Sequence, residues 1–136
     1  MVTSTNIEIK AQVVQFRQST ASILVIDSDP GFCIVLGIML KLYDYGVHRA
    51  HDESEAIACI DDQKPDIIIC NSEIITKDED NFMTYLRSNN TLAKIPIIVI
   101  AAEVEAINTA SLIHNSFIIK PFTAPEIQDL ILSHLT

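Results

Sequence analysis

Short aliphatic runs alternate with longer segments of helical period along this chain from residue 23 onward, and this alternation limits the fold more than any other sequence feature. The first, third and fourth runs are continuously apolar, as expected for strands covered on both faces. Strands separated by helices form βαβ units around a parallel sheet. We therefore predict an α/β fold with a doubly wound, five-stranded parallel sheet. The expected strands are residues 23–26, 47–50, 67–70, 97–101 and 117–119.

Polar residues next to these runs mark where helices should begin and end. Asp29 precedes Pro30, which is typical of an N-cap followed by the first helical turn. Gly46 is placed to end this first helix. Residues 52–55 and 123–126 have the spacing of capping boxes, so they predict two further helix starts.

The length of 136 residues fits one compact domain. Residues 23–136 contain the alternating pattern and are expected to form that domain. Residues 1–22 lie outside the pattern and are either a flexible arm or an added packed element. Their apolar side chains fit a strand or a weak helix equally well; they are Ile7, Ile9, Ala11, Val13, Val14 and Phe16.

The charge balance argues against several classes of partner. Nine Lys and Arg against eighteen Asp and Glu give a formal charge of −9, which disfavours nucleic acid and anionic membrane surfaces. No apolar run approaches the roughly 20 residues of a membrane span, and the N-terminus lacks a secretory signal pattern. We expect a soluble, cytoplasmic protein. The three cysteines, Cys33, Cys59 and Cys70, have aliphatic neighbours that favour reduced, buried thiols.

The candidate site lies where the strands end, because open parallel sheets form their sites outside the carboxyl ends of the strands. The residues at those positions combine one carboxylate, one amide and one amine with two small side chains. They are Asp27, Ser28, Asn71, Ala101 and Lys120.

Four of the stretches that carry these residues, at 23–30, 64–71, 95–102 and 118–122, resemble in order and separation the receiver domain of bacterial two-component response regulators. The resemblance covers residues 23–135. It implies the flavodoxin-like receiver topology and a signalling role in a phosphorelay, in which such domains accept a phosphoryl group on an Asp after the third strand.

The matching positions depart from the family pattern at three places. The phosphoacceptor position is Asn71, and a neutral amide cannot act as the nucleophile. The acidic pair that holds Mg²⁺ in the family is Asp27 and Ser28 here, so Mg²⁺ should bind weakly or not at all. The hydroxyl that contacts the phosphoryl group falls at Ala101, whose methyl group donates nothing. The resemblance therefore implies a degenerate receiver, or pseudo-receiver, that is not an enzyme and needs no cofactor.

Other family features fall on the last strand. The conserved lysine matches Lys120, and the resemblance implies a cis peptide bond to Pro121. The aromatic switch position corresponds best to Phe117. From the residues alone, a static ion pair between Lys120 and Asp27 is favoured over a residual ion site.

The resemblance also implies a protein-interaction face for a protein partner or a second copy of the domain. This face comprises residues 103–113, 117–119 and 126–135. Two alternatives remain at this stage. One is a receiver modified at another residue, such as Ser28 or Ser72, or at Asn71 after deamidation to Asp. The other is a flavodoxin-like nucleotide binder, which would need a phosphate-cradling loop after the first strand.

Overall fold

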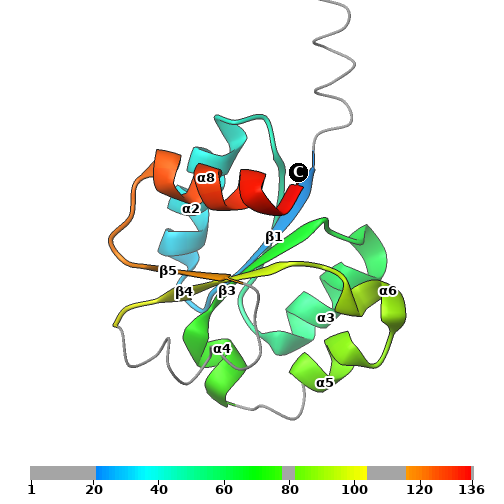
Figure 1. Ribbon diagram of the computed structural model, residues 1–136. Coiled ribbons are helices and arrows are strands. Elements are labelled where there is room, and N and C mark those ends of the chain that lie inside the picture. The colour runs from blue at the N-terminus through cyan, green and yellow to red at the C-terminus, as the bar shows by residue number, and fades with distance from the viewer. Residues whose placement is uncertain (1–20, 78–81, 104–115, 136) are drawn as a thin grey trace, which may run out of the picture.

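The structure, a computed structural model, describes residues 21–77, 82–103 and 116–135. These residues form one five-stranded sheet in the order β2-β1-β3-β4-β5, with all neighbouring strands parallel (Figure 1). The predicted doubly wound α/β fold is confirmed. The strands are β1 (Ser22–Ile26), β2 (Gly46–Ala50), β3 (Ile67–Asn71), β4 (Ile97–Ala101) and β5 (Ser116–Ile119).

Helices cover both faces of the sheet (Figure 1). They are α2 (Pro30–Lys41), α3 (Glu53–Gln63), α4 (Ser72–Lys77), α5 (Phe82–Arg87), α6 (Asn90–Ala93) and α8 (Ala124–Leu135). Alternate residues of a strand point to opposite faces, and β1 accordingly contributes to two apolar cores. Ile23 and Val25 pack with α2 and α8, whereas Leu24 and Ile26 pack with α3 and α5.

The predicted caps set the helix starts. The carboxylate of Asp29 accepts hydrogen bonds from the backbone N–H groups of Gly31 and Phe32, and Pro30 begins α2. At the start of α8 the capping box is reciprocal. Thr123 Oγ1 accepts from the N–H of Glu126 at 3.3 Å, and Glu126 Oε1 accepts from the N–H of Thr123 at 3.2 Å. These bonds satisfy donors that a helix leaves unpaired at its first turn.

The end of α2 differs from the prediction. The helix ends at Lys41, and Gly46 is the first residue of β2 instead of the helix terminator. The turn between them is made by Asp44, whose φ of 66° lies in the left-handed region. Asp is one of the few residue types other than glycine that enters this region readily, so the chain reverses earlier than the glycine position suggested.

A second difference follows β3. Helix α4 begins at Ser72, directly after the last residue of β3, where no sequence pattern predicts a helix start. In α8, Ile127 and Ile131 are buried, whereas Leu135 is 41% exposed. No helix among the described residues is long and apolar enough to span a membrane.

Strand register brings the candidate residues to one edge of the sheet. Ile26, the last residue of β1, pairs with Cys70 in β3, so Asp27 and Asn71 follow at the same level. Ala101 pairs with Ile119 in β5, and Lys120 comes next in the chain. Residues 103–113 of the expected interaction face lie, apart from residue 103, outside the described residues, as do residues 1–20.

Candidate functional site

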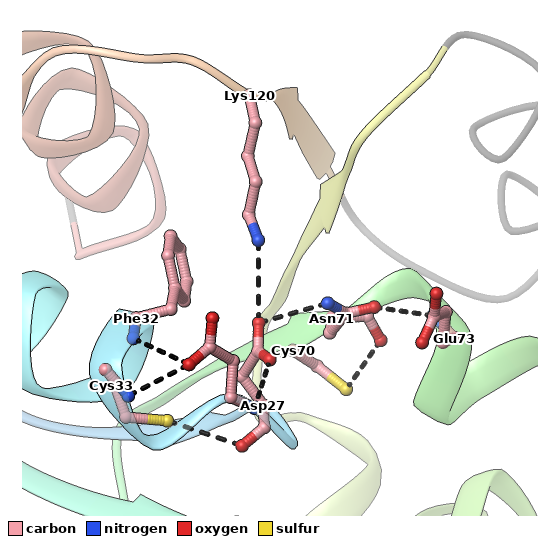
Figure 2. Close-up of polar contacts among 9 residues, drawn as sticks. Asp27, Phe32, Cys33, Cys70, Asn71, Glu73 and Lys120 are labelled. Atoms are coloured by element: carbon pink, nitrogen blue, oxygen red, sulfur yellow. Dashed lines mark hydrogen bonds and ion pairs between the residues drawn. The ribbon is translucent and has the colours of Figure 1, made fainter.

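Asp27 is the centre of the candidate site. Its side chain is almost completely buried, with the whole residue 2% exposed. Oδ1 accepts a hydrogen bond from the backbone N–H of Asp29 at 2.9 Å, and Oδ2 accepts from Asn71 Nδ2 at 3.0 Å. Lys120 Nζ lies 3.8 Å from the same Oδ2 (Figure 2). A buried carboxylate needs such partners because burial removes its hydration.

Both the nitrogen and the oxygen of the Asn71 side-chain amide are hydrogen-bonded. Its Nδ2 donates to Asp27, and its Oδ1 accepts from the backbone N–H of Glu73 at 2.8 Å. Only one orientation of the amide meets both partners, because a carboxylate needs a donor and an N–H group needs an acceptor. Asn71 is therefore a fixed bridge between the end of β1 and the first turn of α4 (Figure 2).

Lys120 reaches Asp27 from the end of β5 (Figure 2). Its Nζ also lies 3.8 Å from the centroid of the Phe32 ring, a favourable cation–π contact. Phe32 in turn meets Phe122 edge to face, with ring centroids 6.3 Å apart. The predicted ion pair between Lys120 and Asp27 is confirmed, and the Lys120–Pro121 peptide bond is cis.

The other three predicted residues make different contributions. Ser28 is exposed, and Ala101 is buried with only a methyl group to offer. Phe117 lies in β5 and is 41% exposed. The structure thus brings Asp27, Asn71 and Lys120 into direct contact, while Ser28 and Ala101 take no part in that polar network.

Ser28 lines a cavity of about 530 Å³ beside the network. Three acidic side chains share this lining: Asp52, Glu53 and Glu73. Such an environment repels a phosphate group unless a cation balances it. The turn after β1 adds no phosphate cradle, because the N–H of Asp29 is bonded to Asp27. This geometry disfavours the nucleotide-binder alternative.

The polar network does not fit Mg²⁺. This ion requires near-octahedral coordination by oxygen ligands. Here both oxygens of Asp27 already accept hydrogen bonds, and Asn71 turns its NH₂ group, not its oxygen, toward the carboxylate. Within the described part of the chain, no group of three or more His, Cys, Asp or Glu side chains is arranged to hold a metal ion.

Two thiols lie next to the network. Cys33 Sγ donates to the backbone oxygen of Asp27, and Cys70 Sγ donates to that of Asn71, each at 3.4 Å. Burial raises the pKa of both thiols, and the negative charge of Asp27 raises it further. Both sulfurs therefore stay protonated and serve as packing groups, as the sequence predicted for these cysteines.

The sequence did not indicate what three further residues contribute to the site. Glu73 contributes its backbone N–H, which donates to Asn71 and which no sequence pattern signals. Phe32 contributes its half-buried ring, which lies against Lys120 Nζ. Phe122, two residues after Lys120, was noted only as part of the family stretch. The available sequence signal was the presence of two aromatic residues near Lys120 and Asp27: Phe122 follows Lys120 by two residues, and Phe32 follows Asp27 by five.

Comparison with known proteins agrees with this fold. A family model described as the response regulator receiver domain matches residues 23–132. The chain belongs to the response regulator receiver domain family.

Individual relatives are more distant. The chain is 26% identical over 121 residues to the sensor histidine kinase TmoS of Ectopseudomonas mendocina, covering 87% of this chain but only 12% of that protein. A response regulator structure from Chloroflexus aurantiacus has a TM-score of 0.77 at 22% identity, covering 86% of this chain and 98% of the other.

A second structural relative is described with a bound metal. The receiver domain of the sensor histidine kinase PA1611 from Pseudomonas aeruginosa has a magnesium ion coordinated in its active site cleft. It has a TM-score of 0.76 at 21% identity, with 86% of this chain and 98% of the other covered. Likeness at this level of identity establishes the fold alone.

Proposed function

We propose that this receiver domain is a pseudo-receiver, which acts through protein contact and forms no aspartyl phosphate. The observation that carries the proposal is the hydrogen-bonded amide of Asn71. Its nitrogen is engaged by Asp27 and its oxygen by the N–H of Glu73. An amide has no free carboxylate lone pair to attack phosphorus, and this one also lacks the freedom to reorient.

The surroundings of Asn71 support the same proposal. Phosphoryl transfer depends on a metal ion and on donors that stabilise charge on the phosphoryl oxygens. Asp27 is the only carboxylate of the family's metal site that this chain retains, and its oxygens already have donors. Ala101 offers no hydroxyl. We therefore propose that Mg²⁺ binds weakly or not at all and that the domain needs no cofactor.

The route of signalling is then contact with another protein. By its family resemblance, we place this contact on β5, α8 and the segment before β5. Among the described residues of this face, four large apolar side chains are 37–43% exposed, as expected for a surface that is buried on association. They are Phe117, Ile119, Leu132 and Leu135.

Incubation with acetyl phosphate and Mg²⁺, followed by intact mass measurement, tests the proposal. The wild-type chain should gain no phosphoryl group. The triple variant Ser28→Asp, Asn71→Asp, Ala101→Thr restores the acidic pair, nucleophile and hydroxyl, so it is the positive control and should gain one. A stable phosphoryl group on the wild-type chain would contradict the proposal.

The single variant Asn71→Asp restores the nucleophile without restoring the residues that hold the metal ion and the phosphoryl oxygens. We expect it to remain a poor acceptor, because Ser28 and Ala101 still fail to hold the metal and the phosphoryl oxygens. Beryllofluoride, which mimics the phosphoryl group, should leave its NMR spectrum around residue 71 unchanged. Clear beryllofluoride-induced shifts in this variant would show that the amide alone blocks the chemistry.

A further inference from the structure

Helix α2 exposes an apolar stripe to solvent. Four large aliphatic side chains lie along its outer side: Ile34 (49% exposed), Val35 (57%), Ile38 (57%) and the C-cap residue Leu42 (76%). The inner side of α2 is filled by Cys33, Leu36 and Leu40, which pack on the sheet. The outer side of a surface helix is normally polar, so a contiguous apolar stripe marks an interaction surface.

The chain before β1 joins the fold beside this stripe. The backbone oxygen of Ala21 accepts a hydrogen bond from the N–H of Gly46 at 3.1 Å, and Ser22 pairs with Gly46 in the sheet. Gly46 is only four residues beyond Leu42, the most exposed member of the stripe. The described chain therefore begins, at Ala21, near the carboxyl end of α2.

The composition of residues 1–20 matches the stripe. They carry seven large apolar side chains and two basic residues against one acidic residue, so this segment is positive in a chain of net charge −9. Five of the apolar side chains lie within residues 7–16: Ile7, Ile9, Val13, Val14 and Phe16. Side chains of this kind are stabilised by packing on another apolar surface.

The chain between Ala21 and residues 7–16 is long enough for these residues to reach the apolar stripe on α2. The stripe runs from Ile34 to Leu42, which are eight residue steps apart, about 12 Å at the rise of an α-helix. Four residues separate Phe16 from Ala21, and an extended chain spans roughly 3.3 Å per residue. A segment attached at Ala21 can therefore lay residues 7–16 along the stripe, and attachment to the same chain raises its effective concentration there.

We propose that residues 7–16 of the same molecule cover the apolar stripe formed by Ile34, Val35, Ile38 and Leu42. This contact makes the segment an added packed element of the domain, and it hides the outer side of α2 from other proteins. The inference rests on different residues from the proposed function and does not depend on it.

A photoactivatable cross-linking amino acid in place of Ile38 tests this contact. Heavy and light isotopic chains are mixed, so that links within and between molecules have different masses. Links within one molecule to residues 7–16 should exceed, several-fold, those from the same amino acid at Arg87, an exposed position on α5. Links to a second molecule, or no excess over the Arg87 control, would overturn the proposal.

Charge substitution gives an independent readout in the full chain. The variant Val13→Asp, Phe16→Asp should release the segment and shift the methyl resonances of Ile34 and Ile38. The variant Thr3→Asp, Thr5→Asp adds the same charge outside the apolar run and should leave those resonances in place. Unchanged Ile34 and Ile38 signals in the first variant, or equal shifts in both variants, would count against the contact.

Discussion

Asn71 Nδ2 lies 3.0 Å from Asp27 Oδ2, joining the ends of two adjacent strands through one buried hydrogen bond. The bond gives Asp27 a donor in addition to the N–H of Asp29 and the more distant Lys120. A carboxylate in the place of Asn71 would set two negative charges at this separation. The amide instead supplies a hydrogen-bond donor to the Asp27 carboxylate.

Asn71→Asp should lower the free energy of unfolding by about 1–3 kcal/mol at pH 7, because it removes a donor and places like charges together. A like-charged neighbour raises the pKa of a carboxyl group, so the lost stability should return as the pH falls and one carboxyl group becomes protonated. Urea unfolding at several pH values measures this effect.

Asn89→Asp is the matched control for that change. Asn89 is an exposed N-cap whose Oδ1 accepts from the N–H groups of Thr91 and Leu92, and Asp serves equally well in that role. Its stability should match the wild type. The role given to Asn71 is wrong if its Asp variant is as stable as the Asn89 variant at pH 7.

Lys120→Met should lower the free energy of unfolding by about 1–2 kcal/mol. This loss is larger than that expected for a surface ion pair and smaller than that for a fully buried one. The side chain of Lys120 is 34% exposed, and Asp27 keeps its two hydrogen bonds in the variant. Thermal or urea unfolding measures the loss. Lys94→Met changes an exposed lysine in the same way and should have little effect, so equal losses in both variants would contradict the account.

Much of the fold could be predicted because its signals are local. Continuous apolar runs identified the strands, and Asp29 and Thr123 identified helix starts through bonds made within three residues. The turn at Asp44 and helix α4 were missed. The left-handed turn uses a residue that only tolerates that geometry, and α4 is too short to show a helical period.

The site was predictable in position but not in its bonds. Strand ends place Asp27, Asn71 and Lys120 together in any parallel sheet of this order. The contact of Lys120 with Phe32 and the bond from the N–H of Glu73 depend on helix packing and on the backbone path after β3. Sequence spacing alone does not specify either of them.

Stability should fall above pH 9, because burial raises the pKa of Cys70 above the ordinary thiol value of 9.0. The folded state keeps the proton that the unfolded state releases, so the contribution is complete below pH 9 and is lost as the pH rises toward the folded pKa. One such thiol contributes a slope of about 1.4 kcal/mol per pH unit. Urea unfolding between pH 8 and 10 should show a shallower decline in Cys70→Ala, and identical slopes would exclude this origin.

Thr123→Ala should lower the free energy of unfolding by about 1 kcal/mol, because it removes the hydroxyl that caps α8 and half of the capping box. The exposed Thr84, inside α5, is the control, since Ala is the better helix former there. Thr84→Ala should be neutral or slightly stabilising. An equal effect of both substitutions on urea unfolding would remove the capping explanation.

We propose that the Asn71 amide binds Asp27 in place of a metal ion. The most direct test of this claim is a Mg²⁺ titration followed by NMR of the Asn71 side-chain NH₂ group. These resonances should remain unchanged through millimolar Mg²⁺. The triple variant, which lacks the Asn71 amide, is the binding control, and its backbone amide resonances at residues 27 and 71 should shift over this Mg²⁺ range. A saturable shift of the Asn71 NH₂ signals in the wild-type chain over the same range would contradict the claim.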